Sequence, residues 1–360
     1  MTKVAVIMAG GHGERFWPMS RLSRPKQFLK IFSDHSMIRE TFLRLCSILP
    51  ADQIFIVTGG EFKDRILGEL PEMDEDNVIV EPSRRDTAAA IALSAIHIES
   101  RYPAATMLIC ASDHIIPDLV SFKNVIDSGF KIAKDTSCLL TIGIQPSRPE
   151  TAYGYIETGD TISQADGVNA YEVKQFVEKP DYNRAVQYLD SGNFLWNSGM
   201  FIWETQTLLE ELSIHLPEIY SGILEIGECL GKRDQEEVTL KVFEELPRIS
   251  IDYGLMEKSK NILCITGTFS WDDVGSWSSL YRCLNTDDNN NIQSGQVLSI
   301  NTKDSIILGD QKTLIGVVGV KDLIIVKTRD AILICNKSDE QKVKDLVKEI
   351  QDDDSLHNFL

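Results

Sequence analysis

VAVIMAGGHGERFWPMSRLSRPK, residues 4–26, is the stretch around which we expect the fold to be built. Its first five residues are apolar, as in a buried strand, and they run directly into a glycine-rich loop at residues 10–13. Glycines let the backbone come close to a ligand, and the N–H groups of such a loop can surround phosphate oxygens. Arg15 and Lys26 follow, and both cations suit the same oxygens. The stretch therefore predicts a polyphosphate site at the end of a strand.

The chain then alternates between short apolar runs and helical segments. We expect strands at residues 54–57, 78–80, 107–110 and 139–142, and helices at residues 38–49, 61–70, 86–99 and 121–134. Short apolar strands separated by helices predict a parallel sheet covered on both faces. Ligands of such sheets bind beyond the carboxyl ends of the strands. Because Gly11, Glu81 and Asp113 each follow a strand, we expect them to share one crevice.

A polar stretch at residues 287–291 marks a domain boundary, and the middle of the chain before it is less regular. Beyond it, short β segments recur near residues 297, 306, 314, 323 and 332, and a last helix at 338–350 places Val343, Leu346, Val347 and Ile350 on one side. We predict a catalytic domain at residues 1–285 and a small domain at 286–360. The fold class is α/β: a Rossmann-like, mixed, mostly parallel sheet flanked by helices, then a small β-helix-like domain and a terminal helix.

Composition excludes several classes of partner. The chain of 360 residues carries a formal net charge of −18, which argues against a nucleic-acid or anionic-membrane surface. Its seven cysteines form no CxxC pair, so we expect reduced thiols. We find neither a signal peptide nor an apolar run long enough to span a membrane, and we expect a cytoplasmic protein.

The glycine-rich loop is neither of two common phosphate-binding motifs. The chain lacks the G-x-x-x-x-G-K-[ST] pattern of a P-loop, and Phe16 stands where a dinucleotide fingerprint needs its third glycine. The alternative is a tight turn that binds nothing, which Arg15 and Lys26 make the weaker interpretation. The missing glycine also disfavours a Rossmann dehydrogenase.

The residues of this loop carry a specific resemblance. Residues 10–20, GGHGERFWPMS, followed by RPKQF at 24–28, resemble the opening of mannose-1-phosphate guanylyltransferases. The resemblance covers residues 1–285 and continues through Glu81-Pro82, Arg85-Asp86-Thr87-Ala88, Ser112-Asp113-His114, Tyr153-Gly154-Tyr155-Ile156, Glu178-Lys179-Pro180, Trp196-Asn197-Ser198-Gly199-Met200, Ser250-Ile251-Asp252-Tyr253 and Trp271-Asp272-Asp273-Val274-Gly275-Ser276-Trp277. Bifunctional members also carry an isomerase domain, and because the chain is too short for one we expect no isomerase activity.

The resemblance implies that mannose 1-phosphate attacks the α-phosphorus of GTP and that pyrophosphate leaves. Arg15 would hold the pyrophosphate, Lys26 would lie near the α-phosphate, and Asp113 and Asp273 would bind Mg²⁺. The alternatives are a strand-end cap for Asp113 and a turn with Asp272 for Asp273. Of the two histidines near the site, we interpret His12 as a loop residue and His114 as a support for Asp113.

Recognition of the guanine base is assigned to the region of Glu81, whose carboxylate can accept from both N1–H and the exocyclic amine. The alternative is that Glu81 caps a helix or pairs with Arg84. Asp86 departs from the family, which usually has Asn there, and Asp86 or Thr87 is expected to cap the Ala-rich helix. The complete set of residues assigned to substrate binding is Gly10, Gly11, Gly13, Glu81, Thr87, Ala88, Ser112, Tyr153, Gly154, Glu178, Lys179 and Asn197.

Sugar recognition is assigned to Tyr153, Gly154, Glu178, Lys179 and Asn197, whose polar groups suit hydroxyls and the sugar phosphate. The alternative for Glu178 and Lys179 is a solvated charge pair at a strand end. We expect a homodimer, because the apolar β segments of the small domain need a partner surface. Other functions left open are a sugar-1-phosphate nucleotidyltransferase with a different base or sugar, and a non-catalytic nucleotide-sugar sensing module.

Overall fold

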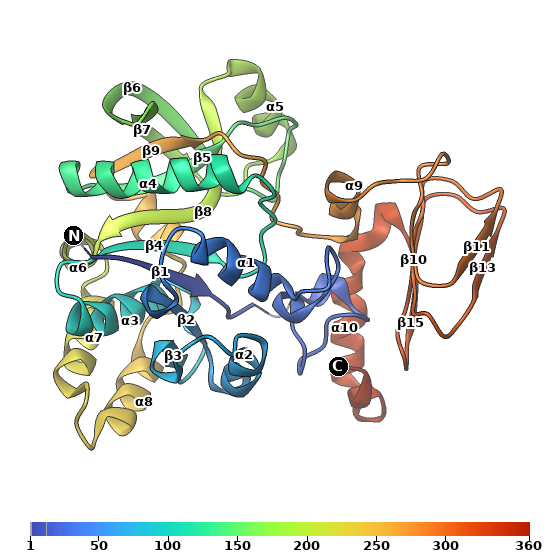
Figure 1. Ribbon diagram of the computed structural model, residues 1–360, viewed down its shortest axis with the longest axis horizontal. Coiled ribbons are helices and arrows are strands. Elements are labelled where there is room, and N and C mark those ends of the chain that lie inside the picture. Colours follow the sequence, from blue (N-terminus) through green and yellow to red (C-terminus); the bar gives the residue numbers. More distant parts are fainter. Residues whose placement is uncertain (1, 12) are drawn as a thin grey trace. The chain divides into compact units, whose positions relative to one another are not determined.

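A mixed sheet is the main element of the computed structural model, which describes residues 2–11 and 13–360 (Figure 1). Its nine strands are β1 (Lys3–Met8), β2 (Ile54–Gly59), β3 (Val78–Glu81), β4 (Thr106–Ala111), β5 (Leu139–Ile144), β6 (Tyr155–Ala165), β7 (Val168–Val177), β8 (Phe194–Glu204) and β9 (Ile262–Gly267). They lie in the order β3-β2-β1-β4-β8-β5-β9-β7-β6.

The strand pairing places the loops that follow the first four strands at one edge. β1 pairs in parallel with β2 and β4, and β2 pairs in parallel with β3. Met8 is opposite both Val57 and Ala111, and Gly59 is opposite Glu81, so the carboxyl ends of these strands meet there. β5 and β9 are also parallel, whereas β8 runs antiparallel to β4 and β5. The predicted fold class is confirmed.

Helices cover both faces of this sheet. The α-helices of the chain are α1 (Met37–Cys46), α2 (Lys63–Glu69), α3 (Asp86–Arg101), α4 (Leu119–Thr136), α5 (Tyr182–Ser191), α6 (Thr205–His215), α7 (Pro217–Cys229), α8 (Gln235–Glu245), α9 (Leu280–Cys283) and α10 (Val343–Asp352). Phe201 and Trp203 of β8 share an apolar core with α3, α6 and α7. Ile202, between them, points to the opposite face, where its side chain lies beside Gly129 of α4.

The C-terminal strands form a small coil of parallel β structure. They are β10 (Ile292–Ser294), β11 (Val297–Ile300), β12 (Ile306–Leu308), β13 (Ile315–Val318), β14 (Leu323–Lys327) and β15 (Ile332–Asn336). β10, β12 and β14 pair in parallel, as do β11 and β13, whereas β15 closes the first set antiparallel to β14. Buried Asn291 links successive turns, because it accepts from the Ser305 N–H (3.0 Å) and donates to the Thr302 carbonyl (2.9 Å).

Helix α10 buries Val343, Val347 and Ile350 in a core that also contains Phe16 and Trp17. The expectation that Leu346 lies on the same side of the helix as these three residues was wrong, since Leu346 is 40% exposed. A helix of this length has a narrow buried stripe, and Leu346 lies at its margin.

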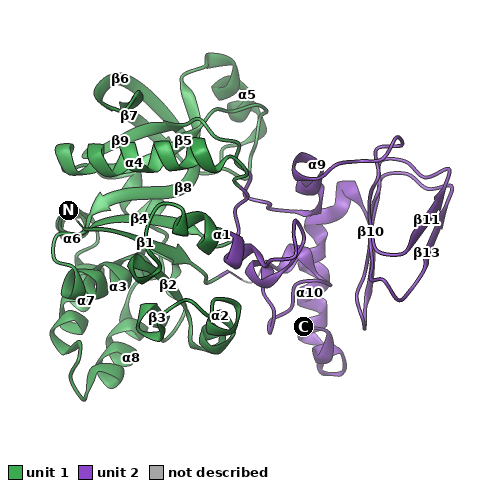
Figure 2. Cartoon of the chain, in the orientation of Figure 1, with its two compact units in different colours: residues 1–10, 41–112, 116–271 green, residues 11–40, 113–115, 272–360 purple. Residues whose placement is uncertain are grey.

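The chain divides into two compact units whose sequence ranges interleave (Figure 2). Unit 1 contains residues 1–10, 41–112 and 116–271, and unit 2 contains residues 11–40, 113–115 and 272–360. The chain therefore passes from unit 1 to unit 2 directly after the ends of β1 and β4. Within the described residues, no helix is both long enough and apolar enough to cross a membrane.

Candidate active site

A polar pocket of about 410 Å³ lies within unit 2. It is lined by the four residues to which catalysis is assigned, Arg15, Lys26, Asp113 and Asp273, together with Gly13, His114 and Lys344. These residues come from four separate segments of the chain. The sequence therefore folds so that the carboxylates of Glu14, Asp113 and Asp273 and the cations of Arg15, Lys26 and Lys344 line one cavity.

Lys26 is the link between the two carboxylate-bearing segments. Its Nζ atom lies 2.9 Å from Asp113 Oδ2 and donates to the Asp273 backbone carbonyl at 2.7 Å. The Lys26 side chain is buried, whereas that of Asp113 keeps 29% of its surface exposed. Burial opposes ionisation of Asp113, but the charges of Lys26 and His114 more than offset it and hold the pKa of this carboxyl below its usual range. Asp113 is thus an anion at neutral pH.

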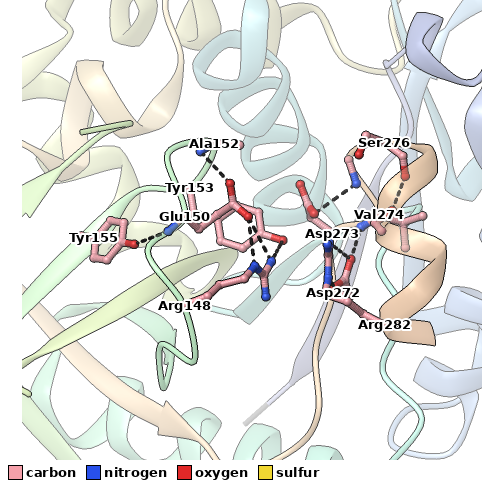
Figure 3. Close-up of polar contacts among 12 residues, drawn as sticks. Arg148, Glu150, Ala152, Tyr153, Tyr155, Asp272, Asp273, Val274, Ser276 and Arg282 are labelled. Carbon is pink, nitrogen blue, oxygen red and sulfur yellow. Dashed lines mark hydrogen bonds and ion pairs between the residues drawn. The ribbon is translucent and has the colours of Figure 1, made fainter. Parts of the chain in front are cut away.

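A backbone bridge between Ile115 and Asp272 brings the segments of Asp113 and Asp273 together. The Ile115 N–H donates to the Asp272 carbonyl (2.9 Å), and the Asp272 N–H donates to the Ile115 carbonyl (3.1 Å). The Asp272 side chain is buried, accepts from the Val274 N–H at 2.8 Å and forms an ion pair with Arg282 (Figure 3). Asp272 is therefore structural, while its neighbour Asp273 lines the pocket.

The loop that carries Asp273 is held in an uncommon backbone conformation. Val274 has a φ of 49°, which is unfavourable for a β-branched residue, and its side chain is fully buried. Asp273 Oδ1 accepts from the Gly275 N–H at 3.1 Å, so this carboxylate forms a turn with the residue two positions later. Arg15 Nη1 donates to the Gly275 carbonyl at 2.8 Å. The loop is thus fixed at three successive residues.

Gly13 is required by the close approach of Lys26. Its φ is 62°, and a Cβ atom at this position would lie 2.2 Å from Lys26 Cβ. Arg15 contributes a buried Nε–H that has no hydrogen-bond partner among residues 2–11 and 13–360. A buried donor without a partner costs free energy unless a ligand satisfies it, which favours an anion in the pocket.

In unit 1, Glu81 lies beside Gly10, since a Cβ atom on Gly10 would be 3.5 Å from Glu81 Oε1. Burial raises the pKa of Glu81 to about 7; the neighbouring Arg84 charge lowers it, and the Glu61 and Asp86 charges raise it further. Arg84 forms an ion pair with Glu61 at 3.3 Å. Glu81 is therefore a carboxyl that titrates near neutral pH at the end of β3.

The expectation that Asp86 or Thr87 occupies the cap position of α3 was wrong, although Asp86 Oδ1 does accept from the Thr87 N–H at 2.8 Å in the first turn. The residue at the cap position is Arg85, without a side-chain cap, and Asp86 is the first helical residue with a φ of 67°. This left-handed conformation is tolerated by Asp and Asn better than by most residues, which explains a short polar residue there. The Thr87 hydroxyl accepts from the Ile251 N–H (2.9 Å), and the Ala88 N–H donates to the Ile249 carbonyl (3.2 Å).

A cluster of polar groups in unit 1 contains Gly154, Glu178 and Asn197. A Cβ atom on Gly154 would lie 2.4 Å from Glu178 Oε2, so this glycine makes room for the carboxylate. Asn197 Nδ2 donates to Asp252 Oδ1 at 2.9 Å. Burial, reinforced by the charge of Glu178, raises the pKa of Asp252 to about 6 despite the Asn197 hydrogen bond. Asp252 had no assigned role, although its motif belongs to the resemblance.

The charge pair considered as an alternative for Glu178 and Lys179 is present, because the Lys179 ammonium forms an ion pair with Glu178. The two side chains differ in burial, however: Glu178 is 9% exposed and Lys179 is 58% exposed. A solvated pair would expose both groups, so the buried carboxylate still suits a ligand.

Aromatic side chains pack beside the polar cluster of Gly154, Glu178 and Asn197, around the loop at residues 148–155. Arg148 stacks over the Trp196 ring at 4.8 Å. Its Nε–H also donates to Glu150 Oε2 at 3.2 Å, as Figure 3 shows. Tyr153 packs edge-on against Trp196, with ring centroids 5.2 Å apart. Tyr153 is buried, with 6% of its surface exposed.

Ser112 and Gly11, both assigned to substrate binding, differ in burial. The buried Ser112 donates its N–H to the Met8 carbonyl (3.1 Å) and accepts from the Thr41 hydroxyl at 3.2 Å, which joins the ends of β1 and β4. Gly11 is exposed, with no atom within 4 Å of an added Cβ. His12 lies outside the described residues.

The carboxylates of the pocket suit a Mg²⁺ ion whose remaining ligands are phosphate oxygens and waters. Among the described residues no group of three or more His, Cys, Asp or Glu side chains could hold a metal. Asp113 and Asp273 line the pocket with hard oxygen ligands, and the carboxylate of Glu14 lines it as well. Mg²⁺ is usually bound by one or two carboxylates, phosphate oxygens and waters, so this pair meets the requirement.

Known proteins resemble the chain along nearly its whole length. Residues 4–290 match the nucleotidyl transferase family, and residues 295–350 match the MannoseP isomerase/GMP-like beta-helix domain. A mannose-1-phosphate guanylyltransferase of Salmonella montevideo is 39% identical over 351 residues, which are 96% of this chain and 73% of that protein.

Two solved structures also match. One, described as a mannose-1-phosphate geranyltransferase of Thermus thermophilus, is 30% identical with a TM-score of 0.87 and covers 98% of this chain and 100% of that chain. The other, described as a mannose-6-phosphate isomerase of Helicobacter pylori, is 28% identical with a TM-score of 0.59 over 75% of this chain and 99% of that chain.

Proposed function

Because the chain belongs to the mannose-1-phosphate guanylyltransferase family, we propose that it transfers GMP from GTP to mannose 1-phosphate, giving GDP-mannose and pyrophosphate. The observation that carries this proposal is the Lys26 contact to Asp113 and to the Asp273 backbone in a pocket shared with Arg15. It combines the cations a triphosphate needs with the carboxylates a divalent ion needs.

The reaction needs no nucleophile from the protein. A phosphate oxygen of mannose 1-phosphate forms the new bond to the α-phosphorus, while the bond to the oxygen bridging the α- and β-phosphorus atoms breaks. The residues of the pocket have to align two anions and neutralise charge on the leaving group. Arg15, with its buried unsatisfied Nε–H, would bind the pyrophosphate oxygens, and Lys26 would move its charge from Asp113 towards the α-phosphate.

Asp113 and Asp273 would hold Mg²⁺, which when bound supplies positive charge to the phosphate oxygens of GTP. Asp113 suits this role because it is already ionised, and the Ile115–Asp272 bridge holds its segment beside that of Asp273. Glu81 would recognise guanine, and Glu178 and Asn197 would bind the sugar hydroxyls. Asp252 would orient the Asn197 amide through their hydrogen bond.

The proposal includes a homodimer in the cytoplasm. Strands β11, β13 and β15 expose large apolar side chains that a second copy could cover, namely Leu298, Ile300, Val318, Ile332 and Ile334. Sedimentation velocity tests this, since a species at the chain mass of 40.4 kDa alone would contradict it. Cell fractionation tests the location.

Pyrophosphate release with Mg²⁺ tests the function. GTP with mannose 1-phosphate should give turnover well above UTP, ATP or glucose 1-phosphate combinations. Faster turnover of another pair would indicate a different nucleotidyltransferase, and turnover with none would indicate a sensing module. Conversion of mannose 6-phosphate to fructose 6-phosphate without nucleotide would instead indicate an isomerase.

We expect GTP binding to depend on the ionisation of Glu81. With a pKa of about 7, Glu81 is protonated below neutral pH and loses the second acceptor that guanine requires. The dissociation constant should therefore rise about tenfold per pH unit below 7. Glu81→Gln should bind weakly and show only the pH dependence of GTP itself, which makes it the control. Parallel curves for the two proteins would contradict the assignment.

The same carboxyl also predicts a stability difference. Its pKa is raised by folding, so wild-type protein should lose stability relative to Glu81→Gln as pH rises from the usual carboxyl range through 7. Thermal denaturation of both proteins across this range measures the difference independently of activity.

A further inference from the structure

Lys344 of α10 lines the same pocket as Arg15, Lys26, Asp113 and Asp273. It belongs to the small C-terminal domain, whose role the motifs do not indicate. All of these residues lie within unit 2. The last helix of the chain thus contributes a cation to the phosphate pocket.

Two sets of contacts hold the backbone on the N-terminal side of Lys344. Glu340, four residues earlier, accepts from the Ser276 hydroxyl (2.9 Å) and the Ser278 N–H (2.8 Å), both in the loop that follows Asp273. Val343, directly before Lys344, is buried in the core that contains Phe16 and Val274. The start of α10 is therefore attached to the Asp273 loop and to the turn that carries Arg15.

The other cations of the pocket are partly engaged by the protein. Lys26 contacts Asp113, and Arg15 donates one N–H to Gly275. Lys344, by contrast, is exposed and forms no ion pair with any residue in the described ranges 2–11 and 13–360. Its ammonium is available for a ligand, and a flexible lysine can follow an anion that moves.

We propose that Lys344 binds the β- and γ-phosphates of GTP and the pyrophosphate formed from them. This inference rests on the proposed function and gives the C-terminal domain a part in the reaction site. A chain with a formal net charge of −18 repels polyphosphates at long range, so local cations must concentrate the substrate. Lys344 supplies one more charge where pyrophosphate leaves.

Steady-state kinetics in both directions test the assignment. Lys344→Ala should raise KM for GTP, and for pyrophosphate in the reverse reaction with GDP-mannose, by about tenfold, the usual cost of one charged contact. KM for mannose 1-phosphate should stay within about twofold, because the sugar contacts belong to other residues. Lys344→Arg should recover most of the affinity. Lys348→Ala, an exposed lysine one turn further along α10 and outside the pocket, is the matched control.

Several outcomes would overturn the inference. These are an unchanged KM for pyrophosphate in Lys344→Ala, an equal rise in the KM of both substrates, or the same effect in Lys348→Ala. Lys344→Gln repeats the test if the alanine variant has a lowered thermal midpoint. The proposed function would survive each of these results, because it fails only if wild-type protein makes no GDP-mannose.

Discussion

Asp273→Asn is expected to lower kcat for GDP-mannose formation by about 10²–10³-fold, the loss typical when one preorganised electrostatic group is removed. The change is isosteric, and an Asn Oδ1 atom can still accept from the Gly275 N–H that Asp273 now binds at 3.1 Å. The loop should therefore keep its shape and lose only its charge. The thermal midpoint should stay within a few degrees of wild type.

Asp272→Asn is the matched control for this prediction, since it makes the same chemical change one residue earlier. Asp272 is buried and paired with Arg282, so the cost should appear as lost stability of about 1–3 kcal/mol, with a much smaller loss of kcat. Assays at saturating substrate, with folding checked by thermal denaturation, measure both quantities. Equal kcat losses in the two variants would show that the loop geometry matters and that the Asp273 carboxylate does not.

Gly13→Ala is expected to be the most damaging small substitution in the glycine-rich loop. The new Cβ atom would lie 2.2 Å from Lys26 Cβ, so the backbone near Lys26 has to shift. Gly13 cannot move away easily, because its carbonyl accepts from the Ser20 hydroxyl (2.8 Å) and the Phe16 N–H (3.0 Å). A displacement of about 1 Å at a positioning group can reduce the rate about 10²-fold, and we expect a loss of that order.

Gly231→Ala separates this clash from backbone strain. Gly231 also has a positive φ, 75°, but an added Cβ atom would have no neighbour within 4 Å. It should lose about 1–2 kcal/mol of stability, the cost of the left-handed conformation, and keep wild-type kcat. Kinetics of both variants at a temperature where each is folded provide the test. If Gly13→Ala also kept wild-type kcat, Lys26 would not depend on the close approach of Gly13.

Sequence patterns were sufficient for the elements whose residues contact each other locally. The apolar run after residue 3 became β1, and the repeated apolar segments beyond residue 291 became the parallel coil. The uninterrupted apolar run of β1 matches a strand that is buried on both faces, and the apolar segments of the coil recur at regular spacing, so in both cases neighbouring residues contain the information.

The convergence of Asp113 and Asp273 was available only through resemblance. Nothing in their spacing predicts it, because it depends on the bridge between Ile115 and Asp272. Nothing in the sequence indicates that Lys344 lines the pocket, because the apolar stripe of α10 is fully explained by packing against the core. The position of Asp86 was predicted wrongly, because Asp is favoured both at a cap position and at a first helical residue with a positive φ, and the sequence does not distinguish the two.

The Mg²⁺ dependence of pyrophosphate release, compared between wild type and Asp113→Asn, tests the central claim most directly. That claim is that the pocket of Arg15, Lys26, Asp113 and Asp273 holds the metal and the triphosphate. Wild-type protein should require Mg²⁺, and the variant should need at least about tenfold more Mg²⁺ and reach a maximal rate about 10²-fold lower. A variant that reached the wild-type rate at the same Mg²⁺ concentration would contradict the account.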